Sequence, residues 1–173
     1  MPTQQFTRRG FLRAGLATAA ATLGIPGSVI AGMRAGDRPK SVTLSDLAGA
    51  KVALPEAYAG KVLAVHFWAT WCPYCIKEIE ALEALFGQYR ERGFVPVSVN
   101  VGETKAVAAE FLRTRTVTYP ILLDTESTAA KLYGVTGIPT TVILDRGGAI
   151  AFKILGEINR EGLRRILSGP LGT

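Results

Sequence analysis

The sequence is poor in the residues from which metal sites and disulfide scaffolds are built. It has one histidine, His66, and two cysteines, Cys72 and Cys75, among 173 residues. A bridge between cysteines three positions apart closes too short a loop to gain much stability from chain entropy. A structural zinc site needs four ligands, and the sequence has neither a second cysteine pair nor a histidine cluster. We therefore expect no bound metal and a chemical role for the cysteine pair.

Acidic residues are absent from the first 36 residues, which contain Arg8, Arg9, Arg13 and Arg34. The net charge of +6 comes largely from this segment, because the remaining 16 basic and 14 acidic residues give only +2. No basic stripe with interleaved aromatic residues follows, so we expect no nucleic-acid partner.

The N-terminal segment has the pattern of an export signal. Residues Thr7–Leu12 resemble a twin-arginine motif, and an uncharged stretch rich in Ala, Gly and Thr follows over Ala14–Met33. Twenty uncharged residues are about the minimum for a membrane span, so a cleaved signal and a retained anchor both stay open. We predict a twin-arginine-type signal peptide or anchor over residues 1–36 and one domain over residues 37–173. The domain is expected in the periplasm or at the outer face of the cytoplasmic membrane.

After this segment, strand and helix patterns alternate. Predicted strands are the hairpin within Val42–Leu54, the apolar runs Val62–Trp68, Phe94–Val101 and Ile121–Leu123, and a hairpin formed by Thr141–Leu144 and Ala149–Leu155. Predicted helices run from Pro73 to Gly93, after the capping residue Thr104, over Thr125–Tyr133, and after the capping residue Asn159. The order β-β-β-α-β-α-β-α-β-β-α indicates an α/β fold, with a central mixed sheet flanked by helices on both faces.

The helix that begins at Pro73 is amphipathic. Its apolar residues recur at helical spacing and are expected to face the core: Ile76, Ile79, Leu82, Leu85, Phe86 and Tyr89. Its charged residues are expected to face away from the core: Lys77, Glu78, Glu80 and Glu83.

The cysteine pair follows a buried strand and opens this helix. Cys72 at the helix N-terminus would face unpaired backbone N–H groups and the positive end of the helix dipole. Both effects favour the thiolate, so the pKa of Cys72 should fall below that of a free cysteine. Cys75 lies one turn further on, where we expect it to be shielded and able to resolve a mixed disulfide formed by Cys72.

Several separated motifs resemble those of one protein family. The run Phe67–Cys75 is similar to the active-site segment of thioredoxin-like proteins, and Gly137–Thr141 is similar to their cis-proline loop. The segments Tyr119–Asp124 and Val99–Glu103 resemble the TlpA/ResA branch. The resemblance implies a thioredoxin-like fold with an N-terminal β-hairpin and an extra inserted helix. It also implies thiol-disulfide oxidoreductase activity through a Cys-Pro-Tyr-Cys pair, with no cofactor besides that redox-active disulfide.

The resemblance also implies roles for residues around the pair. Pro139 would be cis and would pack against the cysteines, whereas the sequence alone favours an ordinary trans turn. Ile138 would offer backbone hydrogen bonds to an extended substrate. Trp71 would form an apolar rim beside Cys72, although simple core packing is the alternative. Two further substrate-binding positions, Pro73 and Tyr74, lie between the cysteines.

Two titratable residues have open roles. Glu103 matches an acid that the resemblance places near the cysteines, where it would exchange protons with Cys75; the alternative is a solvated acid at a helix start. His66 departs from the family, which has an acid or an amide at this strand position. It is either a core histidine with satisfied hydrogen bonds or a proton partner beneath the disulfide.

The resemblance favours a monomeric periplasmic disulfide reductase. Its partners would be protein disulfides, with apocytochrome c among the candidates, and a membrane electron donor of the DsbD/CcdA kind. An oxidant or isomerase of the DsbA/DsbC kind is the nearest alternative. A copper chaperone needs wider cysteine spacing and a downstream histidine, and a peroxiredoxin needs a Thr-x-x-Cys motif, so both are disfavoured.

Overall fold

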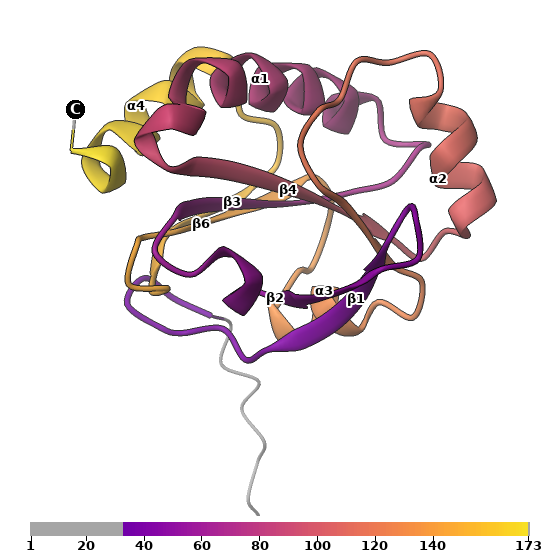
Figure 1. Ribbon diagram of the computed structural model, residues 1–173, viewed down its shortest axis with the longest axis horizontal. Coiled ribbons are helices and arrows are strands. Elements are labelled where there is room, and N and C mark those ends of the chain that lie inside the picture. The colour runs from indigo at the N-terminus through magenta and orange to yellow at the C-terminus, as the bar shows by residue number, and fades with distance from the viewer. Residues whose placement is uncertain (1–32, 173) are drawn as a thin grey trace, which may run out of the picture. The chain divides into compact units, whose positions relative to one another are not determined.

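The computed structural model describes residues 33–172, whose elements follow the predicted order (Figure 1). The predicted signal or anchor over residues 1–36 lies outside the described residues, except for its last four positions. Gly36 donates a backbone hydrogen bond to Ile150, and Ile150 donates one to Asp37, so the first described residues are attached to the domain. None of the helices within residues 33–172 combines the length and apolar character needed to cross a bilayer.

One mixed sheet forms the centre of the domain, with strand order β2-β1-β5-β4-β3-β6-β7. β3 (Val62–Trp68) lies between β4 (Phe94–Val101), which is parallel to it, and β6 (Thr140–Leu144), which is antiparallel. All seven residues of β3 are buried, as its continuous apolar run predicts for a central strand covered on both faces.

The outer strands complete the sheet on both sides. β5 (Ile121–Asp124) is parallel to β4, and β7 (Ile150–Leu155) forms the predicted C-terminal hairpin with β6. The predicted N-terminal hairpin is confirmed as β1 (Val42–Asp46) and β2 (Lys51–Leu54). β1 also pairs with β5, which attaches this hairpin to the main sheet.

Helices cover the two faces of the sheet (Figure 1). α1 (Pro73–Tyr89) and α4 (Arg160–Leu171) lie side by side on one face, and α3 (Thr128–Leu132) lies on the other. The inserted helix α2 (Lys105–Leu112) follows β4, and Thr104 Oγ1 accepts a hydrogen bond from the Val107 N–H as its predicted cap. Asn159 caps α4 in the same way, through a 2.8 Å hydrogen bond from the Gly162 N–H.

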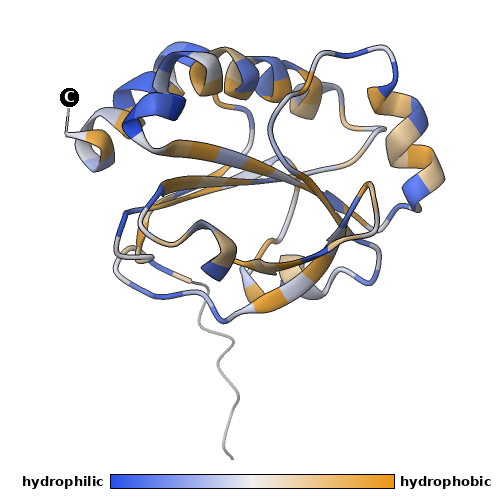
Figure 2. Ribbon diagram, in the orientation of Figure 1, coloured by the Kyte–Doolittle hydropathy of each residue, from blue (hydrophilic) through white to orange (hydrophobic). Residues whose placement is uncertain are grey.

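Alternation along the strands produces two apolar layers, one on each face of the sheet. The strands are largely orange, and therefore hydrophobic, in Figure 2. Val62, Ala64 and Trp68 of β3 belong to the layer beneath α1 and α4, whereas Leu63, Val65 and Phe67 belong to the layer beneath α3. His66 has the same parity as Trp68, so its side chain lies in the α1 layer. This parity decides which polar groups can meet the cysteines.

The predicted exposure of Glu78 is wrong. Its side chain is fully buried, unlike that of the neighbouring Lys77 and Glu80, which are exposed. Since α1 is covered by the sheet below and by α4 alongside, its buried face is wider than a single apolar stripe, and Glu78 falls inside the widened face.

The predicted start of α3 is three residues too early. Residues 125–127 form a turn, because Ser127 adopts a left-handed conformation with φ of 55°. The Asp124 carboxylate then accepts hydrogen bonds from the N–H groups of Ala129 and Ala130, at 3.1 and 2.8 Å. The helix therefore begins at Thr128, with its N-terminal cap supplied by the preceding strand.

Candidate active site

The cysteine pair occupies the N-terminus of α1, as predicted. Cys72 is the N-cap residue, and its Sγ accepts a 3.3 Å hydrogen bond from the backbone N–H of Cys75. Cys72 and Cys75 form a disulfide, with their Cα atoms 5.4 Å apart. Pro73 occupies the first helical turn, where a backbone N–H would have no helical partner. This geometry directs the free N–H groups of the helix end towards a Cys72 thiolate.

Both cysteines are buried in the disulfide, and the expected shielding of Cys75 is confirmed. Cys72 is 3% exposed and Cys75 is fully buried. The residues beside them are open to solvent: Trp71 is 71% exposed and Tyr74 is 55% exposed. Core packing of Trp71, which the sequence left open, is therefore wrong.

The proline loop lies at the adjacent strand end. The Ile138–Pro139 peptide bond is cis, as the family resemblance implied, and Pro139 is buried while Ile138 is half-buried. Phe67 pairs with Thr140 across β3 and β6, so Pro139 comes level with Trp68 at the end where the cysteine segment begins.

A further apolar residue reaches this loop from β7. Leu155 pairs with Thr140, and its side chain is 64% exposed. The next residue, Gly156, donates a 2.9 Å backbone hydrogen bond to the Pro139 carbonyl. Sequence analysis did not identify Leu155, because only the register of β6 and β7 brings it to the proline loop.

Glu103 ties the cysteine segment to the end of β4. Its carboxylate accepts hydrogen bonds from the Thr70 N–H at 2.9 Å, from the Thr70 hydroxyl at 2.6 Å and from the Asn100 amide at 2.6 Å. Thr70 lies two residues before Cys72, so these bonds hold the loop that delivers the nucleophile. The simple alternative of a solvated helix-start acid is wrong, while proton exchange with Cys75 stays a prediction.

Glu78 is the titratable residue that sequence analysis missed. It lies one helical turn after Cys75, and spacing of three residues places both side chains on one face of α1. The Thr141 hydroxyl donates a hydrogen bond to Glu78 Oε1. Burial raises the pKa of Glu78 to about 7, and the Thr141 hydrogen bond opposes that rise. The i, i+3 spacing from Cys75 was the signal available in the sequence.

A polar row crosses the sheet beneath Glu78. His66 of β3 pairs with Ser98 of β4 on one side and with Thr141 of β6 on the other. His66 Nδ1 lies 3.1 Å from Ser98 Oγ, which lies 3.1 Å from the Tyr119 hydroxyl. Burial lowers the pKa of His66 to about 3, so the ring is neutral at physiological pH.

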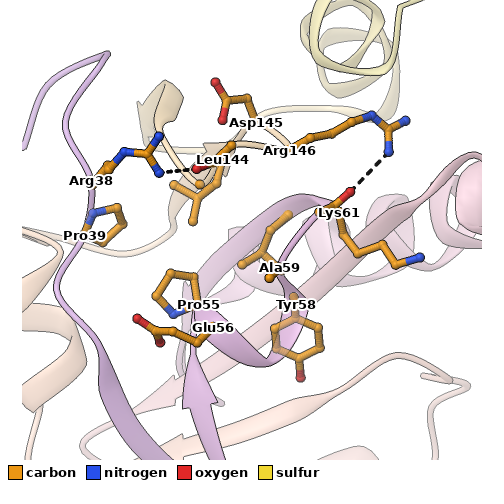
Figure 3. A pocket seen from close by; sticks show the side chains of 14 residues that line it. Arg38, Pro39, Pro55, Glu56, Tyr58, Ala59, Lys61, Leu144, Asp145 and Arg146 are labelled. Carbon is orange, nitrogen blue, oxygen red and sulfur yellow. Dashed lines mark hydrogen bonds between the residues drawn. The ribbon is translucent and has the colours of Figure 1, made fainter.

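A separate cavity of about 250 Å³ lies at the other end of β3 (Figure 3). Its lining includes Lys61, which precedes the strand, whereas the cysteines follow the strand's last residue, Trp68. Arg38 donates to the Gly147 carbonyl, and Arg146 donates to the Gly60 carbonyl at 3.4 Å. These guanidinium groups hold loops together, and the cavity does not belong to the cysteine site.

Within residues 33–172, no group of three or more His, Cys, Asp or Glu side chains is placed to hold a metal ion. Cys72 is surrounded by the second sulfur of the pair, the buried Glu78 carboxyl group and the exposed aromatic side chains of Trp71 and Tyr74. Such a site is suited to exchange between a dithiol and a disulfide.

Comparison with known proteins agrees with this chemistry. The chain matches the AhpC/TSA family over residues 35–153. It is 33% identical to the thiol-disulfide oxidoreductase ResA of Geobacillus thermodenitrificans over 132 residues, which cover 76% of this chain and 75% of that protein. The corresponding ResA of Bacillus thuringiensis is 30% identical over 135 residues, or 78% of each chain.

Solved structures give the same result. A thiol:disulfide interchange protein of the thioredoxin family from Chlorobium tepidum is 28% identical and superposes with a TM-score of 0.70. The match covers 80% of this chain and 98% of that one, which confirms the predicted thioredoxin-like fold. The chain therefore belongs to the AhpC/TSA family, and it is a thiol-disulfide oxidoreductase of the ResA type.

Proposed function

We propose that this protein is an exported reductase of protein disulfides, in which Cys72 is the nucleophile and Cys75 the resolving thiol. The observation that carries the proposal is the position of Cys72 at the N-cap of α1, with Cys75 and the buried Glu78 carboxyl on the turns behind it. The cysteines supply the electrons, and the helix end and the carboxyl control the protons.

The first step is attack on the substrate. The Cys72 thiolate attacks one sulfur of the substrate disulfide, and the other substrate sulfur leaves as a thiolate that takes up a proton. The N–H groups at the start of α1 stabilise the attacking thiolate, which keeps it available at neutral pH.

The second step resolves the mixed disulfide. Cys75 gives its proton to the Glu78 carboxylate, which takes the role predicted for Glu103, because the Glu103 carboxylate accepts hydrogen bonds from Thr70 and Asn100. The Cys75 thiolate then attacks Cys72 Sγ. The second substrate sulfur is released as a thiolate, so two electrons have passed to the substrate and the protein holds the Cys72–Cys75 disulfide. A carboxyl group with a pKa of about 7 is matched to accepting and releasing a proton at physiological pH.

The exposed rim selects extended, apolar polypeptide around the substrate cysteine. Trp71, Tyr74 and Leu155 expose large apolar side chains around the cysteines and the proline loop. An extended segment that lies across Ile138 would pair with its backbone and place its sulfur over Cys72. Cysteine-containing segments of incompletely folded proteins, apocytochrome c among them, have this form.

The N-terminal sequence supports export, since Thr7–Leu12 carries the twin-arginine pattern. In the periplasm, or at the outer face of the cytoplasmic membrane, the oxidised pair needs a donor of electrons. A membrane thiol–disulfide carrier of the DsbD/CcdA kind would supply them, and the protein would work as a monomer.

A trapping experiment tests the proposed function. Cys75→Ser removes the resolving thiol, so the mixed disulfide between Cys72 and its substrate should persist. Covalent partners are recovered from a periplasmic extract, released with dithiothreitol and identified by mass spectrometry, with Cys72→Ser/Cys75→Ser as the matched control. Apocytochrome c or other cysteine-containing exported proteins are expected. Recovery of none above the control would contradict the reductase proposal.

A further inference from the structure

Within residues 33–172, four buried polar atoms on the α1 side of the sheet have no hydrogen-bond partner: Trp68 Nε1, Asn100 Oδ1, and one atom each of His66 and Glu78. Among the described residues, His66 Nε2 and Glu78 Oε2 are both buried, and neither has a hydrogen bond. An unsatisfied buried polar atom costs about 1–3 kcal/mol, so two of them in one place call for an explanation.

Thr141 brings these two atoms into the same neighbourhood. Its hydroxyl holds Glu78 Oε1, and its strand position pairs directly with His66. Side chains of directly paired residues on one face start about 5 Å apart at Cβ. The Glu78 carboxyl therefore lies beside Thr141, the residue that pairs with His66 across β3 and β6.

The chain of hydrogen bonds from His66 through Ser98 and Tyr119 to the Ile79 carbonyl assigns the tautomer of His66. The Tyr119 hydroxyl lies 3.4 Å from the Ile79 carbonyl, which only accepts, so Tyr119 donates its single proton there. Ser98 then donates to the Tyr119 oxygen, and His66 Nδ1–H donates to Ser98 Oγ. Each of these three hydrogen bonds then has one donor and one acceptor. The proton of the neutral ring is on Nδ1, so Nε2 carries an unshared lone pair and can only accept.

An unprotonated Nε2 and an ionised carboxylate are both acceptors, so no hydrogen bond can form between them. A protonated Glu78 is a donor, so the two atoms become complementary only when Glu78 carries a proton. We propose that His66 is a positioning residue for the redox reaction: when Glu78 takes up the proton that Cys75 gives up, its carboxyl turns towards the ring, and His66 Nε2 accepts a hydrogen bond from Glu78 Oε2–H and so holds that proton.

Burial favours this protonated form, whereas the hydrogen bond from Thr141 favours the ionised one. Glu157, on the loop after β7, faces the Glu78 carboxyl and raises its pKa further, although Glu157 also pairs with Lys77 at 3.6 Å. The backbone N–H of Ile158 opposes the rise. Tyr119 faces Glu78 from the segment before β5, and burial raises the pKa of this phenol so far that it stays protonated. Lys77 is exposed and pairs at the surface with Glu157.

The role of this hydrogen bond in the reaction rests on the proposed function, because the proton that it holds comes from Cys75. The hydrogen bond itself is independent of substrate, electron donor and direction of electron flow. It can be measured in the oxidised protein, in which neither cysteine titrates. A failed trapping experiment would therefore leave this test unaffected.

The first measurement uses the wild-type full chain. His66 is its only histidine, so a long-range 1H–15N correlation spectrum of the uniformly 15N-labelled protein contains one imidazole. We expect the Nδ1–H tautomer, and an Nε2 shift that moves with the Glu78 titration while the ring stays neutral. The Nε2–H tautomer, or an Nε2 shift that stays constant through that titration, would overturn the proposal.

The second measurement compares two variants through the 13C shift of the Glu78 carboxyl. His66→Asn keeps a donor at the Nδ1 position but has no atom at Nε2, whereas His66→Gln restores an amide acceptor there. We expect His66→Asn to lower the Glu78 midpoint by about half to one pH unit, the equivalent of one hydrogen bond. His66→Gln should stay closer to wild type. An unchanged or raised midpoint in His66→Asn, or equal shifts in both variants, would overturn the proposal.

Discussion

Replacement of Glu78 by glutamine should change how stability depends on pH. Gln keeps the shape of the side chain and an oxygen that accepts from Thr141, but it cannot ionise. The wild-type carboxyl is buried, and this burial raises its pKa from the ordinary 4.5 to about 7. Glu78→Gln therefore removes one titration from the folded state and leaves the packing in place.

The sign follows from proton binding. Between pH 4.5 and about 7, the folded protein holds a proton on Glu78 that the unfolded chain has lost, so the free energy of unfolding falls as pH rises. At about 1.4 kcal/mol per pH unit, the interval amounts to about 3 kcal/mol. This stability is fully present below pH 4.5 and is lost above about pH 7. The titration of His66, whose pKa burial lowers to about 3, acts in the opposite sense but is common to both proteins.

Urea unfolding of the oxidised proteins by circular dichroism, from pH 4 to pH 8.5, measures the effect. Relative to wild type, Glu78→Gln should gain about 3 kcal/mol across this range, mostly between pH 4.5 and 7. Glu80→Gln, at an exposed position on the same helix, is the control and should run parallel to wild type. Parallel curves for Glu78→Gln and wild type would show that the carboxyl is not held in its protonated form.

Three further outcomes are expected. In the reduced protein at neutral pH, brief iodoacetamide treatment and peptide mapping should find Cys72 modified before Cys75, since the helix N-terminus activates its thiolate; preferential modification of Cys75 would reverse the assigned roles. Glu103→Ala should cost about 2–3 kcal/mol in urea unfolding because three donors lose one carboxylate, with Glu126→Ala, an exposed acid, as the control; equal effects would contradict the clamp on Thr70. Trp71→Ala should change stability by no more than about 0.5 kcal/mol because the side chain is 71% exposed, yet should raise the KM for a peptide disulfide; an unchanged KM would remove Trp71 from the substrate rim.

The order of elements could be predicted from the sequence because each strand and helix has its own local signal. β3 is a continuous apolar run, and Thr104 and Asn159 are capping residues next to helical spacing. The start of α3 could not be predicted in this way. Its first N–H groups donate to Asp124, which belongs to the preceding strand, and the chain turns between them at Ser127 in a left-handed conformation.

The same distinction applies to the site. The cysteine pair is a local motif, and its position at the start of α1 could be predicted from the change in periodicity there. Glu78 looks solvent-facing on one helix taken alone, and its burial depends on the sheet and on α4. Glu103 contacts Thr70, 33 residues away, and that pairing requires β3 and β4 to lie side by side.

The reduction potential of the Cys72–Cys75 pair tests the central claim most directly. The purified protein is equilibrated with redox buffers of dithiothreitol or glutathione at pH 7, the thiols are alkylated, and the reduced fraction is counted by mass spectrometry. A reductant of protein disulfides should have a potential nearer to thioredoxin's, about −270 mV, than to DsbA's, about −120 mV. A value close to that of DsbA would mean that the pair accepts electrons from its substrates, and the proposed reductase would instead be an oxidant.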